Sequence, residues 1–280
     1  DTQAIQSNMN YIIMAIIAII ILIEAGRRVL GLALSLIAVI FLAYDFLGPY
    51  MPELIIHKGA SLNKIAGHMF LTTEGIFGVP LGVSAGFVFL FVLFGSLLDK
   101  AGAGEYFINL AFSMLGKYRG GSAKASIIAS GFMGIMSGSS IANTVTTGTF
   151  TIPLMKRTGF RAEQAAAVEV SASSNGQLMP PVMGAAAFIM AEFLGMAYTD
   201  VVIAAFIPAF VAYFGLFYII HLEALKLGLK GMDDEDIPPK WKTFIQGIHY
   251  LIPIMFLLYT LVVLRESAAS AAFNAIMLLM

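Results

Sequence analysis

The chain has 280 residues, of which 59% are hydrophobic and only 12% are charged. About a quarter of the residues of a soluble domain carry charge, so this composition indicates an integral membrane protein surrounded by a lipid bilayer. The absence of cysteine excludes disulfides, cysteine-ligated zinc and thiol catalysis, and a formal net charge of -1 gives no reason to expect a nucleic-acid partner.

Apolar runs in the first hundred residues predict membrane-spanning helices, because a bilayer core about 30 Å thick takes roughly 20 helical residues. Residues 9–23 form a short or partial span, residues 29–47 a full span, and residues 80–98 another. Residues 65–78 mix polar and apolar side chains and are expected at the membrane interface. Residues 103–115 are too few to cross upright and too amphipathic for lipid, so they predict a surface-lying arm.

The next apolar stretch, "IMSGSSIANTVTTGTFTIPLM", is interrupted at its centre by polar residues. Its arms, residues 123–136 and 142–155, are each about 14 residues and too short to cross the membrane alone. Basic clusters precede and follow the pair: Lys117, Arg119 and Lys124, then Lys156, Arg157 and Arg161. A single continuous helix would separate these clusters, whereas the positive-inside rule favours both in the cytoplasm. The sequence therefore predicts a hairpin that enters from the cytoplasm and turns back.

A second break falls in residues 162–194, which are expected to exit the membrane. Within "VSASSNGQLMPPVMG", Pro180 and Pro181 lack amide donors and Asn175-Gly176 favours a turn, so a helix should unwind here and restart near Val182. Unpaired backbone groups inside a membrane are tolerated where they line a cavity or bind a ligand. The two breaks are expected to face each other, which is the physical signature of secondary transporters.

The rest of the chain continues this alternating topology. Residues 201–225 return to the cytoplasm, a lysine-bearing loop follows, and residues 245–264 exit again. Glu169 and Glu192 fall inside predicted spans, and each could serve function or pair with a basic residue near a helix end. The chain starts without methionine and ends within an apolar run, so we expect a fragment of a longer protein.

Other interpretations of the two breaks remain open. A patch rich in serine and threonine can serve helix packing alone, and the hairpin could be the pore loop of a channel or an element of a non-transporting membrane scaffold. Enzyme activity is not expected, because the sequence contains no HExxH, GxSxG or Walker motif. A serine nucleophile at Ser137 would lack a base, since the four histidines fall outside the middles of the predicted spans.

Two long segments carry a resemblance to a known family. "SGSSIANTVTTGTFTIPLMKRTGFRAEQAAAVEVSASSNGQLMPPVMGAAAFIMAEFLG" resembles the large membrane component of tripartite ATP-independent periplasmic (TRAP) transporters. "TTEGIFGVPLGVSAGFVFLFVLFGSLLDKAGAGEYF" is similar to the fused form, in which the small and large membrane components are one chain and which is associated with TAXI-type binding proteins. The resemblance covers about residues 24–230.

The resemblance implies an all-α polytopic protein of the bacterial inner membrane that works by an elevator mechanism, with a re-entrant hairpin and a discontinuous helix. It implies uptake of organic acids, delivered by a periplasmic substrate-binding protein of the TAXI type and driven by a cation gradient. The cation is expected to be Na⁺, with H⁺ as the alternative. Hard oxygen ligands suit Na⁺.

Family positions transfer to this sequence residue by residue. The implied sodium ligands are Ser137, Gly138, Ser139, Ser140, Ser173, Gly176, Met179 and Pro180. The implied substrate contacts are Ser140, Asn143, Thr144, Ser174 and Asn175. Implied regions are a small-component region and connector (1–60), the first helices and arm of the large component (61–116), the first-repeat transport region (117–230) and the start of a second repeat (231–280). The second hairpin of the family is absent from this sequence, so only one of two inverted repeats is expected.

Overall fold

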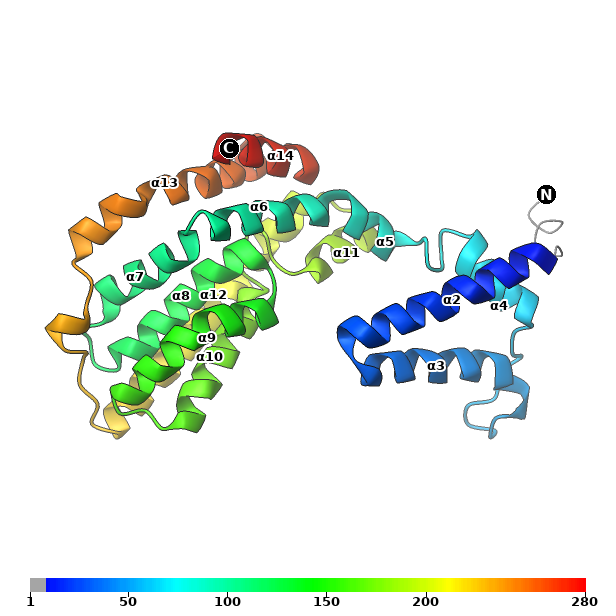
Figure 1. The fold of residues 1–280 in the computed structure, drawn as a ribbon, viewed down its shortest axis with the longest axis horizontal. Coiled ribbons are helices and arrows are strands. Elements are labelled where there is room, and N and C mark those ends of the chain that lie inside the picture. Colours follow the sequence, from blue (N-terminus) through cyan, green and yellow to red (C-terminus); the bar gives the residue numbers. More distant parts are fainter. Residues whose placement is uncertain (1–8) are drawn as a thin grey trace. The chain divides into compact units, whose positions relative to one another are not determined.

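The computed structural model describes residues 9–280, so the first eight residues of the predicted region 1–60 lie outside the described part. The described residues form helices and no strands, as predicted for an all-α protein (Figure 1). Among the described residues, five helical segments are long and apolar enough to cross a membrane: Met9–Leu30, Leu32–Tyr50, Val79–Lys100, Tyr198–Lys226 and Asp234–Val263. The contacts divide the chain into a first unit that ends at Gly82 and a second unit, Val83–Met280.

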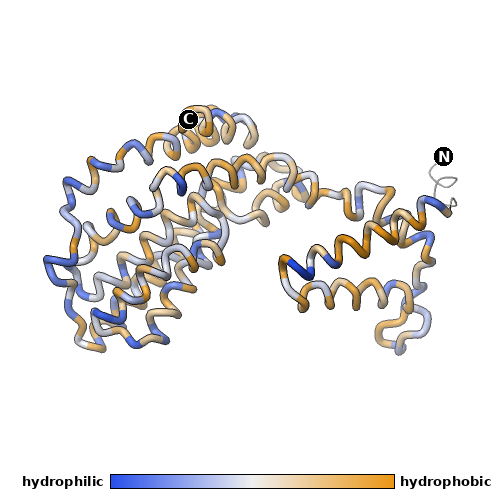
Figure 2. The backbone as a smooth tube through the Cα atoms, viewed as in Figure 1, coloured by the Kyte–Doolittle hydropathy of each residue, from blue (hydrophilic) through white to orange (hydrophobic). Residues whose placement is uncertain are grey.

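Within residues 9–78, the first unit is built from helices that bury few side chains. These are α2 (Met9–Leu30), α3 (Leu32–Leu47) and α4 (Leu62–Leu71), with a short 3₁₀ turn at Gly48–Tyr50. Ile12 and Ala15 of α2 pack on Ala66 of α4. Most of the remaining apolar side chains are exposed along the helices, which appear orange in Figure 2, and this is typical of surfaces that face lipid.

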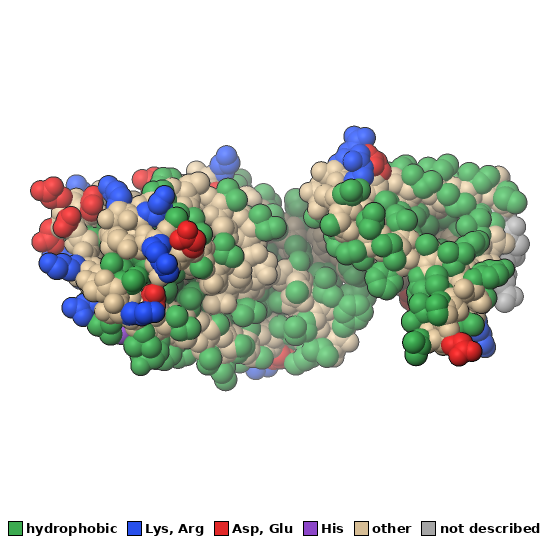
Figure 3. Space-filling model, turned by 90° about the horizontal axis from the view of Figure 1, so that it is seen from below, with side chains coloured by type: hydrophobic (Ala, Val, Ile, Leu, Met, Phe, Trp, Pro, Cys, Tyr) green, Lys and Arg blue, Asp and Glu red, His purple; other side chains and the backbone are tan. Residues whose placement is uncertain are grey.

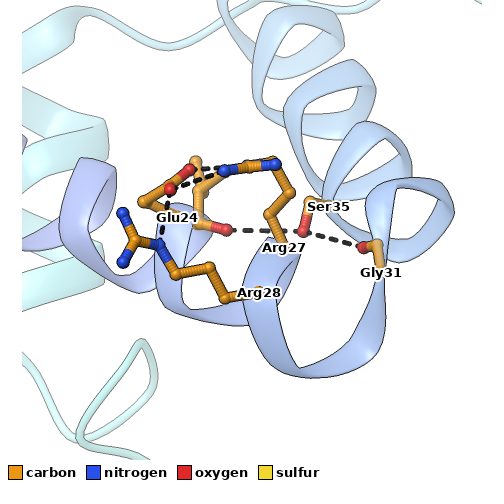
Figure 4. A network of polar contacts seen from close by, with 6 residues as sticks. Glu24, Arg27, Arg28, Gly31 and Ser35 are labelled. Carbon is orange, nitrogen blue, oxygen red and sulfur yellow. Dashed lines mark hydrogen bonds and ion pairs between the residues drawn. The ribbon is translucent and has the colours of Figure 1, made fainter.

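Helix α2 is longer than the predicted run of residues 9–23 because its charged end stays helical. Glu24 accepts hydrogen bonds from Arg27 Nε and Nη2, both at 2.7 Å, and from Arg28 Nε at 2.8 Å (Figure 4). These contacts at i+3 and i+4 spacing stabilise a helical turn. Gly31, at a φ of 90°, then separates α2 from α3, and the Ser35 hydroxyl lies 3.4 Å from the Ile23 carbonyl across the turn.

A long helix with one irregular turn crosses the boundary at Gly82 and leads into the second unit. Helix α5 (Val79–Val83) passes through a π-helical turn at Ser84–Val88 into α6 (Phe89–Lys100). Helix α7 has the predicted bounds, Ala103–Leu115. Most of its residues are buried, because α8 and α13 pack against it. Its position at a membrane surface stays a prediction.

The predicted hairpin is formed by α8 (Gly121–Ser137) and α9 (Ser140–Arg157), which lie side by side (Figure 1). Each arm is longer than the 14 residues predicted, since the helices extend through the polar ends of the hairpin. The last turn of α9 contains Lys156 and Arg157, which interact favourably with the negative end of a helix dipole.

The basic clusters that flank the hairpin meet at one end of the second unit. Lys117 Nζ lies 2.6 Å from Asp234, and Arg157 lies 3.8 Å from Asp236. Both partners belong to one acidic turn, the 3₁₀ segment Asp234–Asp236. Charged side chains gather at this end of the unit in Figure 3. Lys117 and Arg157 therefore lie at one end of this unit, as the predicted hairpin requires, and the cytoplasmic location of that end stays a prediction.

The remaining helices follow the predicted order. The broken helix consists of α10 (Ala162–Gly176) and α11 (Ala185–Leu194), followed by the long α12 (Tyr198–Lys226). Helix α13 (Lys240–Leu258) continues into a π-helical turn, Tyr259–Val263, and α14 (Ala268–Leu279) follows. One core cluster joins α8, α9, α10 and α12 and includes Ile127, Met155 and Tyr213. This core positions both helix breaks.

Candidate functional site

The tip of the hairpin is a two-residue turn. Gly138 adopts a φ of 58°, a conformation that favours glycine, and its amide donates to the Gly134 carbonyl at 3.0 Å. Ser139 caps α9, because its hydroxyl accepts a hydrogen bond from the Ala142 amide at 3.3 Å. The turn is thus shorter than the polar "SGSSIANT" stretch, and Ser140 already belongs to α9.

The break after α10 covers residues 177–184, and the chain becomes helical again at Ala185 rather than near Val182. The prolines supply no amide hydrogen, and Met183 has a positive φ of 52°, so a regular helix cannot form across this segment. The Gly184 amide donates to the Gln177 carbonyl at 2.9 Å and closes the segment.

The hairpin tip lies directly against this unwound segment. A Cβ placed on Gly138 would lie 2.0 Å from the carbonyl oxygen of Met183, and one placed on Gly184 would lie 3.3 Å from the carbonyl oxygen of Gly138. The Gln177 side chain also donates from Nε2 to the Ser140 hydroxyl at 3.0 Å. The prediction that the two breaks face each other is confirmed.

Four helix ends meet at this contact. The carboxyl ends of α8 and α10 approach closely, since a Cβ on Gly134 would lie 2.5 Å from Gly176 Cα. The amino ends of α9 and α11 begin at the facing residues Ser139 and Gly184. Carboxyl ends of helices carry partial negative charge and amino ends partial positive charge, so the arrangement can attract both a cation and an anion.

The side chain of Tyr198, on α12, holds the unwound segment in place through hydrogen bonds. Its buried hydroxyl lies 2.7 Å from the carbonyl oxygen of Pro181 and 2.8 Å from that of Val182. The ring stacks on Phe188 of α11 with ring centroids 4.1 Å apart. Tyr198 therefore links the break to two helices.

Replacing Tyr198 with phenylalanine removes this hydroxyl and leaves two buried carbonyl groups without that donor. We expect a loss of about 1–3 kcal/mol in the free energy of unfolding. Tyr250→Phe is the matched control, because the exposed Tyr250 hydroxyl donates to the Ala101 carbonyl at 2.6 Å, where water can replace it. Melting temperatures in detergent test this, and equal losses in the two variants would contradict the role given to Tyr198.

A second polar cluster lies deeper, between α9 and α10, around the fully buried side chain of Glu169. Thr151 Oγ1 donates to Glu169 Oε2 at 2.5 Å, and Ser173 Oγ donates to Oε1 at 3.1 Å. Thr147 Oγ1 also donates to Oε1. The cluster continues to α8, because the Ser130 and Ser173 hydroxyls are 3.0 Å apart. The buried carboxyl group thus joins the returning arm of the hairpin to the broken helix.

Asn143 connects the hairpin arms within the same cluster. Its Nδ2 donates to the Ser130 carbonyl at 2.8 Å, and the Ser130 hydroxyl donates to its Oδ1 at 3.3 Å. The side chain is fully buried. Asn143 was predicted as a substrate contact, but its hydrogen-bonding groups face the protein in this structure.

Most of the predicted site residues fall into three groups. Those at the contact between the tip and the break are Ser137, Gly138, Ser139 and Ser140. Thr144 donates to the Ser140 carbonyl within α9, and Gly176 packs on Gly134. Ser173 and Asn143 belong to the deeper cluster around Glu169. Met179 and Pro180 line an apolar cavity of about 500 Å³ between α8 and α12, while Ser174 is exposed and Asn175 is half-buried.

A smaller cavity of about 300 Å³ adjoins the tip on the side of α6. Its polar lining comes from Ser96, Asp99, Ser137, Ser139 and Thr146. Oxygen atoms from α6, the tip and α9 therefore surround a space beside the hairpin turn. No cluster of three or more histidine or acidic residues suited to a metal ion occurs within residues 9–280.

The sequence interpretation left the role of Glu169 open and did not select Ser130, Thr147 or Thr151. The sequence does contain a pattern that points to these residues. Thr147 lies four residues before Thr151, and Glu169 lies four residues before Ser173, so each pair shares one face of its helix. The structure separates the two acids considered, since Glu169 is buried and Glu192 is exposed.

From residue 9 onward, an all-helical fold with five potential spans and two facing helix breaks defines a polytopic membrane protein with discontinuous helices. Residues 17–280 match the family model described as "Tripartite ATP-independent periplasmic transporter, DctM component". The chain belongs to this family, which comprises transporter permeases and not enzymes, and it is a multi-pass protein of the inner membrane.

Curated relatives share parts of this sequence. The C4-dicarboxylate TRAP transporter large permease protein DctM of Vibrio cholerae is 28% identical over 59% of this chain and 33% of its own length. The 2,3-diketo-L-gulonate TRAP transporter large permease protein of Escherichia coli is 23% identical over 66% of this chain and 44% of its own. The isethionate TRAP transporter permease protein DctMQ of Oleidesulfovibrio alaskensis is 34% identical over 32% of this chain and 14% of its own. The chain thus spans less than half the length of these relatives.

Proposed function

We propose that this chain is part of a permease for secondary active uptake of small organic acids. The observation that carries the proposal is the meeting of four helix ends at Gly138 and Gly184. Helix amino ends suit an anionic carboxylate, and carboxyl ends with unwound carbonyl groups suit a cation. The relatives' names give C4-dicarboxylate, 2,3-diketo-L-gulonate and isethionate, all small organic anions, which agrees with this class of substrate.

We further propose Na⁺ as the coupling cation, held near the tip by Ser137, Ser139 and Ser140. These hydroxyls and the neighbouring backbone carbonyl groups are hard oxygen ligands, and two of the serines border the 300 Å³ cavity. The hairpin and the broken helix pack through glycine contacts and the Glu169 cluster, which supports their movement as one body in an elevator mechanism.

The proposed soluble partner is a periplasmic substrate-binding protein of the TAXI type, with a permease in which small and large components are fused. The sequence resemblance of residues 72–107 to the fused form supports this part of the proposal. Uptake by proteoliposomes that requires the cognate binding protein tests it, and equal uptake without any binding protein would favour the channel interpretation.

Sodium coupling predicts that uptake at fixed pH falls strongly when choline replaces Na⁺. The double substitution Ser139→Ala and Ser140→Ala should raise the half-saturating Na⁺ concentration about tenfold, the effect of losing roughly 1.4 kcal/mol of binding free energy. Ser267→Ala is the control, because Ser267 also caps a helix, accepting from the Ser270 amide at 3.2 Å, but lies outside the site. If uptake is unchanged in choline and follows the pH gradient, the coupling cation is H⁺ and not Na⁺.

A further inference from the structure

The loop between α3 and α4, residues 51–61, carries three consecutive apolar side chains that are largely exposed. Leu54 is 98% exposed, Ile55 48% and Ile56 54%. Such a run is unusual in a loop surrounded by water, and exposed apolar patches mark surfaces that contact a membrane or another protein. The loop therefore calls for a partner.

The 51–61 loop folds back against the last turns of α3 instead of extending freely beyond them (Figure 1). The Tyr44 hydroxyl donates to the Ile55 carbonyl at 2.8 Å, and the rings of Tyr44 and His57 lie with their centroids 4.5 Å apart. The Ala60 amide donates to the Asp45 carbonyl at 2.9 Å. These contacts hold the apolar run beside the end of the helix.

The last turns of α3 mark a boundary of the membrane. The segment Leu32–Tyr50 has 19 residues, which at a helical rise of about 1.5 Å extend over about 28 Å, nearly the thickness of the hydrocarbon core. Tyr44 and the exposed Tyr50 lie near its end, and tyrosine is enriched where the hydrocarbon meets the lipid headgroups. A loop attached to Tyr44 therefore lies at this boundary and not in bulk water.

The chemistry of the 51–61 loop fits the membrane boundary. Glu53 and Lys58 flank the apolar run, and both are exposed, so their charged groups can remain among the headgroups. The Ile55 amide donates to the Pro52 carbonyl at 2.9 Å, and the Ile55 carbonyl accepts from Tyr44. Because these backbone groups have partners within the protein, placing the apolar run against lipid costs less free energy.

We propose that the 51–61 loop is a membrane anchor, in which Leu54, Ile55 and Ile56 insert among the acyl chains just below the lipid headgroups. The exposed side chains of Phe46 and Leu47 on α3 continue into the same apolar surface. Insertion at this boundary is favourable in proportion to the apolar area that it removes from water. The partner is the lipid itself, so the proposal is independent of the proposed transport function.

Quenching of tryptophan fluorescence by brominated lipids tests this proposal. Trp241 is the only tryptophan of the sequence, so Trp241→Phe gives a background into which Leu54→Trp is introduced at a fully exposed position. The protein is reconstituted into phosphatidylcholine vesicles that carry bromine either near the headgroup end or near the methyl end of the acyl chains. We expect Leu54→Trp to lose fluorescence mainly to bromine near the headgroups.

Two further variants in the same background calibrate the depth. Ile40→Trp alters an exposed residue near the middle of α3 and should be quenched most by bromine near the methyl ends. Glu235→Trp alters an exposed residue of the acidic turn and should be quenched by neither lipid. Iodide in the water should quench Glu235→Trp more strongly than Leu54→Trp.

A loss of fluorescence in Leu54→Trp no greater than that in Glu235→Trp would overturn the proposal, and iodide then identifies the cause. Quenching of Leu54→Trp by iodide alone places the loop in water, where a soluble partner can reach it. Protection from both quenchers places the loop under protein, such as a second copy of the chain. If Leu54→Trp does not fold, Ile56→Trp supplies the same measurements, since Ile56 is exposed in the same run.

Discussion

Substitution of alanine for Gly138 should abolish sodium-dependent uptake and lower the free energy of unfolding by about 3 kcal/mol or more. The left-handed backbone costs a side-chain-bearing residue roughly 1–2 kcal/mol, and overpacking typically adds about 1–3 kcal/mol. The added Cβ would lie 2.0 Å from the Met183 carbonyl oxygen, so the tip and the break must move apart. Both the fold and the proposed ion site depend on that contact.

The substitution Gly195→Ala separates the cost of the left-handed backbone from the cost of overpacking. Gly195 has a nearly identical φ of 62°, but nothing lies within 4 Å of a Cβ placed there. We expect only the backbone contribution, about 1–2 kcal/mol, and unimpaired uptake. Melting temperatures in detergent and uptake by proteoliposomes measure both effects. Equal losses in the two variants would show that the contact with Met183 is unimportant.

Asn143→Ala should be the most destabilising substitution in the buried polar cluster. It removes a donor to the Ser130 carbonyl and an acceptor for the Ser130 hydroxyl, and it leaves a cavity between the hairpin arms. Each unsatisfied buried group costs about 1–3 kcal/mol, so we expect a loss of about 3 kcal/mol in the free energy of unfolding. The control is Asn109→Ala on α7, where the side chain is only half-buried.

The substitution Asn143→Asp tests whether the stability depends on the amide donor of Asn143 or only on the shape of its side chain. Aspartate has the same size but cannot donate to the Ser130 carbonyl when ionised, and it would add a second carboxyl group to the cluster that holds Glu169. We expect a loss at least as large as that of Asn143→Ala. A melting temperature equal to that of the unaltered protein would contradict the hydrogen-bonding role of the asparagine amide.

The hairpin and the broken helix could be predicted because glycine, proline and charge act locally. Gly138 and the Pro180-Pro181 pair mark the two breaks, and the flanking lysines and arginines place the hairpin ends on one face. The exact ends of the helices were harder to predict from the sequence, since tertiary contacts extend the helices. Helix α2 continues through its ion-paired end, and α10 persists to Gly176, where it packs on Gly134.

The deeper polar cluster could not be predicted in full, because it depends on distances between helices. Spacing along the chain places Thr147 with Thr151, and Glu169 with Ser173, but only the packing of α9 on α10 brings the two pairs together. The direction of the Asn143 side chain has the same origin. A polar residue one turn beyond a hairpin tip can face a ligand or the neighbouring arm, and here it contacts Ser130 of that arm.

The acidic turn Asp234–Asp236 has a practical consequence for transport measurements. It forms ion pairs with Lys117 before the hairpin and Arg157 after it, and all four side chains are substantially exposed. Dissolved salt screens such pairs over a Debye length of about 8 Å at physiological ionic strength. The loop that carries this turn therefore holds the base of the hairpin more weakly as salt rises. Comparisons of sodium with choline need constant ionic strength, so that a loosened loop is not mistaken for an empty ion site.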